Sequence, residues 1–272
     1  MQQDETIIQP PGMRIDFSVL RQHRDLLYFF VWRDVKVKYK QTLLGFAWVL
    51  LQPLTLMTMF YFIFSRTLQV ETGIHYLAYV LSGLILWELF SSGIRNSSDS
   101  LVENAAMIRK IYFPRILIPL AALIASLLDF AIAFVLLLVV LVIVAQPVGL
   151  SALLYFPAGL LLTFFASFGA GILLGAMNVK YRDFRYLLPF LIQLLFFGSQ
   201  VVYSIHQVSD PLLRDLLYIN PLNGALELFR APFYNESPHW PGIGISTITT
   251  LILVISGLFY FKKTEAFFAD LV

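Results

Sequence analysis

The chain has 272 residues, of which 58% are apolar and only 13% are charged, and its net charge is +2. Soluble domains carry about 25% charged residues. A water-soluble fold of this length could not bury so much apolar side chain, so the composition indicates an all-α polytopic membrane protein. The absence of cysteine excludes disulfide frameworks, thiolate metal sites and thiol nucleophiles.

The N-terminal region is predicted to end in a helix that lies on the membrane surface. Residues 1–16 are polar and form a loose lead-in without a cleavable signal peptide. Across residues 17–42, Leu27, Val31 and Val35 fall on one helical face, and cations lie on the opposite one. This pattern is typical of a helix in the headgroup layer. The cations expected to face lipid are Arg33, Lys36, Lys38 and Lys40.

Six apolar stretches are predicted to cross the bilayer. They cover approximately residues 43–64, 76–94, 116–144, 153–177, 186–203 and 242–261. A bilayer needs about 20 helical residues, so the third stretch is expected to tilt or to project from the membrane. Gly171 and Gly175 have the G-x-x-x-G spacing that allows close helix approach. Glycine is also simply common in membrane helices, and both interpretations stay open.

Residues 97–115 form a polar island between the second and third stretches. Apolar side chains recur in it at helical spacing. Ser100 and Glu103 have the spacing of a capping box, and Pro114 disfavours helix at the residue before it. A short helix is therefore predicted over about 101–111. It is either a solvated linker or a handle that a soluble partner grips.

Two further segments interrupt the apolar pattern. Residues 178–185 form a second polar island between the fourth and fifth stretches. The region 206–240 contains two apolar-striped pieces, 212–219 and 222–229, which are separated by a break at Asn220. Each piece is too short to span a bilayer. We therefore predict short re-entrant helices that dip into the outer leaflet and are buried against protein.

The distribution of cations predicts the orientation. All but three of the 19 lysines and arginines lie in segments that share one side of the membrane, and the exceptions are Arg66, Arg214 and Arg230. Cytoplasmic segments carry the excess of Lys and Arg. Both termini, including the tail 262–272, and both polar islands are therefore predicted to be cytoplasmic.

No pattern of residues predicts catalysis. The chain lacks a G-x-x-x-x-G-K-[ST] phosphate loop, an H-E-x-x-H pair and a G-x-S-x-G elbow. Its four histidines are far apart, and no pair has helical ligand spacing. We expect no enzyme, no metal site, no cofactor in this chain and no nucleic-acid partner.

Two acidic residues lie within the predicted spans, Glu88 near a cytoplasmic end and Asp129 near mid-span. An ionised Asp at the centre of a membrane helix costs about 2.5–3.5 kcal/mol and usually faces a bundle interior or an aqueous path. A functional and a structural role for Asp129 both stay open. An ion-coupled transporter normally carries several paired charges or matching broken helices, so that mechanism is disfavoured.

Aromatic residues are abundant, with 25 Phe, 13 Tyr and 4 Trp. Most are explained by the interfacial belt of a membrane protein. If the substrate is a sugar polymer, the remainder could stack on sugar rings without a fixed hydrogen-bond register. Together with Glu88 and Asp129, the candidates for such a path are Tyr61, Tyr76, Tyr79, Trp87, Phe197 and Tyr203.

Four stretches resemble ABC-2 type permeases that export polysaccharides, which are the membrane subunits of O-antigen, capsule and teichoic-acid exporters. They are R-D-V-K-V-K-Y-K-Q-T-L-L-G-F-A-W at 33–48, E-N-A-A-M-I-R-K-I-Y-F-P-R at 103–115, Y-R-D at 181–183 and I-N-P-L at 219–222. The likeness covers about 26–261 in the same order and spacing.

The resemblance implies a six-span subunit that works as a homodimer with two copies of a separate ATPase, which binds ATP and Mg²⁺. The helix at 101–111 would be the coupling helix, the loop 178–185 a second contact, and the pieces at 212–219 and 222–229 the outer exit. The basic N-terminal helix would lie near the substrate entrance. The residues expected to contact the ATPase are Leu101, Glu103, Met107, Arg109, Lys110, Arg182 and Asp183.

The function implied by the resemblance is ATP-driven export of a lipid-linked polysaccharide across the bacterial inner membrane. O antigen is the first expectation, and capsule and teichoic acid are alternatives. A drug or small-lipid exporter of the same superfamily is a rival. A membrane-embedded glycosyl- or acyltransferase is a further one, although it would need clustered acids or histidines at one interface.

Overall fold

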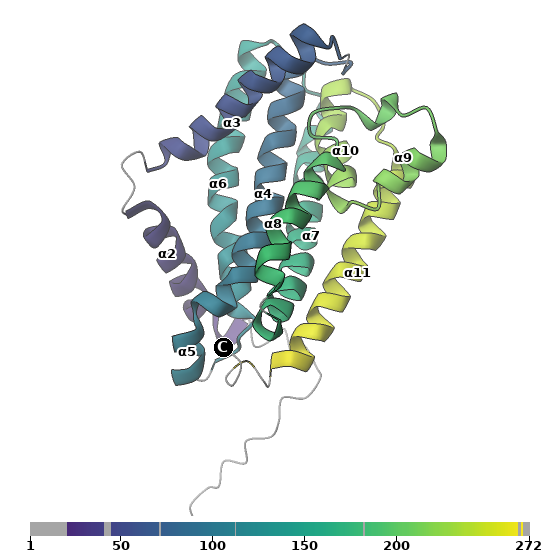
Figure 1. The fold of residues 1–272 in the computed structure, drawn as a ribbon. Helices are drawn as coiled ribbons and strands as arrows, with labels where there is room; N and C mark the ends of the chain where they lie inside the picture. Colours follow the sequence, from purple (N-terminus) through teal and green to yellow (C-terminus); the bar gives the residue numbers. More distant parts are fainter. Residues whose placement is uncertain are drawn as a thin grey trace, which may run out of the picture.

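The computed structural model describes residues 21–40, 45–70, 72–111, 113–181, 183–265 and 268. In these residues every regular element is helical (Figure 1). Five helical segments are long and apolar enough to cross a membrane. They are α3 with η1 (Ala47–Phe60 and Tyr61–Thr67), α4 (Tyr76–Glu103), α6 (Leu117–Ile143), α7 (Ala152–Lys180) and α11 (Trp240–Glu265). The described chain is therefore a polytopic, all-helical membrane protein.

The predicted crossing at 186–203 differs from the other five. Here α8 (Phe184–Phe197) has 14 residues, which is about 21 Å of helix and shorter than a hydrocarbon core of about 30 Å. The Nδ2 group of Asn220 donates to the carbonyl oxygens of Leu195 (3.3 Å) and Gly198 (3.4 Å). These bonds satisfy carbonyls that a longer helix would have used internally, so the chain turns after Phe197.

Helix α4 forms the centre of the bundle, between α6 and α7 (Figure 1). In the most apolar 18-residue stretch of α4, 83% is buried within the chain, whereas the corresponding share in the first span is 6%. The G-x-x-x-G glycines of α7 face α4, because a Cβ on Gly171 would lie 2.6 Å from the Cβ of Ser97. The structure thus shows the close helix approach that the spacing allows.

The first polar island is divided between two helices. Helix α4 continues through Glu103, and only Ala105–Lys110 form the separate short helix α5. The predicted capping box is not formed, since the hydroxyl of Ser100 donates to the carbonyl of Ser97 within α4 (2.7 Å). Asn104 ends α4 and donates through Nδ2 to the Ser100 carbonyl (2.7 Å). The short helix therefore starts four residues later than predicted.

Helix α2 (Arg24–Lys40) lies along α6. Phe30 is buried and packs edge-on against Phe113, with ring centroids 5.5 Å apart. Tyr28, Phe29 and Trp32 are each more than half exposed. The exposed surface of α2 therefore carries aromatic rings, whereas the sequence pattern had emphasised cations. Residues 1–20, 41 and 42 of the predicted N-terminal segments lie outside the described residues.

The region 206–240 contains the 3-10 turn η2 (Ile205–Gln207) and the short helices α9 (Pro211–Leu217) and α10 (Pro221–Tyr234). Figure 1 shows α9 and α10 at the end of the bundle opposite to α5. Both helices begin with the same device, an Asx side chain followed by proline. Asp210 and Asn220 accept the backbone N–H two residues ahead, at 2.9 and 3.2 Å.

The two short helices differ in burial. Nearly all of α10 is buried, whereas α9 has no buried residue in its helical span. The expectation that both pieces are buried against protein therefore fails for α9 within this single chain. Its apolar side chains Leu212, Leu213 and Leu216 are at least half exposed.

Candidate functional site

The α5 end of the bundle presents a small charged surface. Glu103, Arg109 and Lys110 are exposed, Met107 is half-buried, and Ile108 anchors α5 in the core. Leu101, which was expected to contact a partner, is fully buried in the last turn of α4. Sequence reasoning missed Ile111, which is 60% exposed directly after α5.

The two polar islands meet at this same end of the bundle. Asn178 of α7 donates through Nδ2 to the carboxylate of Asp99 on α4 (3.3 Å). Arg115, at the start of α6, donates to the carbonyl of Glu265 at the end of α11. Asp183 is exposed before α8, and Arg182 lies outside the described residues. Two contacts thus join four helix ends in pairs at the α5 end of the bundle, α7 to α4 and the start of α6 to α11.

A charged recess of about 560 Å³ lies between α2, α4 and α6. Arg33 and Asp34 of α2 line one side of it, and they form an ion pair of 2.8 Å. Arg95, Asp99 and Glu103 of α4 line the other side. Both positive and negative side chains face this space, so the recess does not favour a ligand of one particular charge.

Asp129, the mid-span acid, is held by two side chains of α2. The ammonium group of Lys38 and the hydroxyl of Tyr39 contact its two carboxylate oxygens. This pairing explains how α6 carries a buried carboxylate. The ammonium group of Lys38, which was expected to face lipid, is thus paired with a carboxylate of α6. Lys36 and Lys40 are exposed.

Glu88 and Asp129 share one cavity, whereas Tyr76 and Tyr79 are buried. The two acids line a space of about 130 Å³ together with Lys38. The hydroxyl of Tyr79 donates to the carbonyls of Gln200 and Tyr203, and that of Tyr76 donates to the carbonyl of Val202. The two tyrosines therefore hold the turn after α8 through these hydrogen bonds.

The other proposed path aromatics are spread over the bundle. Trp87 packs edge-on against Phe196, with ring centroids 5.1 Å apart. The ring of Tyr61 lies 5.7 Å from the guanidinium of Arg66. Tyr203 donates its hydroxyl to the carbonyl of Phe197, whose ring is 68% exposed.

The end opposite to α5 contains a buried arginine that the sequence identified only as an outside cation. Arg230 of α10 is 3% exposed. Its guanidinium donates to the hydroxyl of Ser82 (3.2 Å) and to three carbonyls, and its centre lies 3.6 Å from the ring centroid of Tyr79. The carbonyls belong to Gln200 (2.5 Å), Tyr79 (2.9 Å) and Val201 (3.1 Å). The charge is thus stabilised by oriented dipoles and by an aromatic face.

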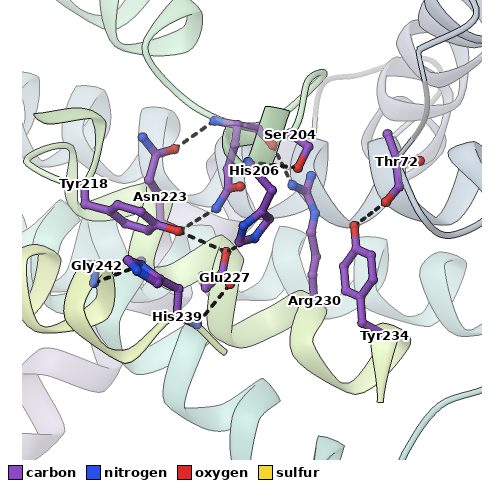
Figure 2. Close-up of polar contacts among 12 residues, drawn as sticks. Thr72, Ser204, His206, Tyr218, Asn223, Glu227, Arg230, Tyr234, His239 and Gly242 are labelled. Carbon is purple, nitrogen blue, oxygen red and sulfur yellow. Dashed lines mark hydrogen bonds and ion pairs between the residues drawn. The ribbon is translucent and has the colours of Figure 1, made fainter. Parts of the chain in front are cut away.

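Glu227, one turn before Arg230, connects four segments (Figure 2). Its Oε2 atom lies 3.2 Å from Nε2 of His206 in η2 and accepts from the hydroxyl of Tyr218 at the end of α9 (3.3 Å). Its Oε1 atom accepts the backbone N–H of His239, next to α11 (3.2 Å). We call Glu227, His206, Tyr218 and His239 the Glu227 cluster.

The electrostatics of the Glu227 cluster favour an ion pair. The hydrogen bond to Glu227 raises the pKa of His206 despite partial burial. Burial opposes ionisation of Glu227, but its bonds to His206 and to the His239 backbone lower the pKa of the carboxyl below its usual value. The pair is therefore charged over a wider pH range than isolated His and Glu side chains.

A cavity of about 770 Å³ opens beside the Glu227 cluster, and we call it the outer cavity. It is bounded by the residues that precede α4, by the first turn of α4, by η2, by α10 and by the start of α11. Tyr234 closes one side, because its hydroxyl donates to the carbonyl of Thr72 (2.6 Å) (Figure 2). No sequence motif marked this site, since its residues come from five separate segments.

The fold and these sites define a multi-pass membrane protein with a small charged surface at one end and a polar cavity at the other. The family model "ABC-2 type transporter" matches residues 25–234. The chain belongs to this family, which confirms the resemblance seen in the sequence.

Several characterised relatives match nearly the whole chain. The O-antigen export system permease protein RfbA of Klebsiella pneumoniae is 29% identical over 91% of this chain and 95% of its own length. RfbA of Myxococcus xanthus is 24% identical over 91% and 96% of the two chains. The polysialic acid transport protein KpsM of Escherichia coli is 23% identical over 86% and 91%.

Proposed function

We propose that this chain is the membrane subunit of an ATP-driven exporter that moves a lipid-linked polysaccharide, O antigen in the first place, across the bacterial inner membrane. One observation carries this proposal. The chain is similar along 91% of its length to proteins named O-antigen export permeases. KpsM, the relative named for polysialic acid transport, supports the broader substrate class of polysaccharides.

The orientation places α5 and both termini in the cytoplasm, and α9 and α10 at the outer face. The cation distribution supports it, because Arg109, Lys110, Lys262 and Lys263 lie at the ends of α5 and α11. In this arrangement α8 is a sixth, shortened crossing, and α9 and α10 are re-entrant helices of the outer leaflet.

The working unit is a homodimer. Only 6% of the most apolar stretch of the first span is buried within the chain. Phe62 of η1 and Phe197 of α8 are each at least 60% exposed. A second copy that packs against this surface would cover it, and an aromatic-lined path would form between the copies.

Energy comes from a soluble ATPase, present in two copies, that binds ATP and Mg²⁺. The ATPase contacts the α5 surface, where Glu103, Arg109 and Lys110 supply charged groups and Ile111 supplies an exposed apolar side chain. Ile108 transmits movement of the ATPase to the bundle, because its side chain is inserted in the core next to α6 and α7.

The test is purification of the chain from its host, followed by transport of glycan into vesicles. A soluble ATPase is expected to co-purify. Glu103→Lys and Arg109→Glu should leave ATP hydrolysis intact and abolish export, while Arg66→Glu, an exposed cation at the opposite end, should export normally. Export by the chain without an ATPase would overturn the function. Normal export by both α5 variants would overturn the coupling assignment alone.

A further inference from the structure

The outer cavity has the chemistry of a saccharide site. Three aromatic residues, Tyr79, Tyr234 and Trp240, line it together with amide, hydroxyl and carboxylate groups. Sugar rings offer apolar C–H faces to aromatic rings and offer hydroxyl groups that both donate and accept hydrogen bonds. The volume of about 770 Å³ lies in the range of small-molecule sites.

Trp240 is the ring best placed to stack on a ligand. It is 55% exposed at the first residue of α11. Tyr155 packs edge-on against it, with ring centroids 6.2 Å apart and planes at 74°. The indole is therefore supported by a neighbour while more than half of its surface remains accessible.

The charges at the cavity argue against an anionic ligand. Arg230 lines the cavity, but its N–H groups are directed at Ser82 and at carbonyls of the surrounding backbone. The carboxylates of Glu227 and Glu236 also line it, and His206 is paired with Glu227. A phosphate would meet two carboxylates here. An acyl chain would displace water from these polar groups and offer them no hydrogen bond in return.

The lining groups are held in position before a ligand arrives. Gln200 donates through its amide to the carbonyl of Asn223 (2.8 Å), and Tyr234 is fixed by its bond to Thr72. The Glu227 carboxylate accepts from three segments. Such preorganisation lowers the entropic cost of binding.

We propose that the outer cavity binds one neutral or amino sugar unit of the exported polysaccharide through stacking on Trp240. The inference rests on the proposed function, which puts a glycan at this face of the membrane. It adds a site within a single subunit, separate from any path formed between two copies.

Titration calorimetry of the full chain in nanodiscs tests the site. The probe is a lipid-free fragment of a few repeats, released from the surface polysaccharide of the host by mild acid. Trp240→Ala should weaken binding about tenfold, while Trp240→Phe keeps most of it. Trp32→Ala, a matched exposed tryptophan on α2, should bind as the wild type. Ser237→Trp, which fills the cavity from an exposed position, should also abolish binding.

Three results would overturn the inference. Unchanged saccharide binding in both Trp240→Ala and Ser237→Trp would exclude the cavity. If Trp240→Ala loses affinity for glycerophosphocholine while its saccharide binding is unchanged, Trp240 is an anchor in the lipid headgroups. A complex that exports glycan without binding the fragment would refute the site and leave the proposed function intact. Fragment binding without ATP-driven export would refute the proposed function alone.

Discussion

Arg230 and Glu227 lie one turn apart on α10, yet each connects a different set of segments. Arg230 joins α10 to α4 and to the turn after α8. Glu227 joins α10 to η2, to the end of α9 and to the start of α11. Single side chains on one short helix thus hold together the end of the bundle opposite to α5.

The His206–Glu227 pair predicts a pH dependence of stability. The pKa of His206 is raised in the fold. Its contribution to the free energy of unfolding is therefore fully present below the pKa of the unfolded state, about 6.5, and is lost as pH rises through the pKa of the folded state. The low pKa of Glu227 acts at the other limit, since its contribution is lost as pH falls through that value. Arg214 and Glu236 also act on His206, with opposite signs.

Thermal unfolding in detergent between about pH 6 and pH 9 measures this effect. His206→Gln should remove the decline in unfolding temperature above neutral pH. The stability lost in this variant at neutral pH should be less than about 1 kcal/mol, because half of the His206 side chain is exposed and screened by water. His75→Gln is the control and should keep the slope of the wild type. An unchanged slope in His206→Gln would assign the pH dependence to another group.

At the scale of elements, the contact between α4 and α7 depends on glycine residues, which have no side chain to keep the helices apart. Gly171→Ala places a methyl group 2.6 Å from the Cβ of Ser97 and should destabilise the bundle by about 1–3 kcal/mol. Gly244→Ala on α11 is the matched control, because nothing lies within 4 Å of its added Cβ. It should be neutral or gain up to about 1 kcal/mol from helix propensity. Thermal unfolding of both variants in one detergent compares them, and equal effects would contradict close packing at Gly171.

The contact between α2 and α6 depends on an ion pair. Lys38→Met leaves the Asp129 carboxylate, which is 10% exposed, without its cation and should cost about 1–3 kcal/mol. Asp129→Asn should also destabilise the fold, and the double variant should lose less than the sum of the two. Thermal unfolding of the four proteins completes the cycle, with Lys36→Met as a control on an exposed lysine. Additive effects would show that the two groups do not interact.

At the scale of the whole molecule, the bundle has two chemically different ends. The end at α5 carries exposed cations, and the other carries the outer cavity between α10 and the start of α11. This asymmetry supports the proposed function, in which the subunit is moved from one side of a membrane and releases its substrate on the other.

The orientation can be measured because the chain has no cysteine. Lys110→Cys and Ser237→Cys each introduce one thiol at an exposed position, at opposite ends of the bundle. In spheroplasts, a membrane-impermeant maleimide should label Ser237→Cys at once and Lys110→Cys only after the membrane is opened. The reverse result would place α5 outside and contradict the proposed coupling to a cytoplasmic ATPase.

Local sequence determined the membrane class, the five long helices and the break at Asn220, which proline follows. Hydropathy over about 20 residues and capping over three residues are short-range properties. They are readable without knowing what each helix touches. The exposed part of α5 was recognised for the same reason, since it is a polar helix between two apolar runs.

Only the tertiary structure decided where α8 ends, what pairs with Asp129 and how Arg230 is buried. The partners are distant in sequence, since Lys38 and Asp129 are 91 positions apart and Ser82 and Arg230 are 148 positions apart. Asn220 ends α8 from 22 residues beyond Gly198. Such contacts form only when separate helices pack together, so no periodicity within one segment contains them.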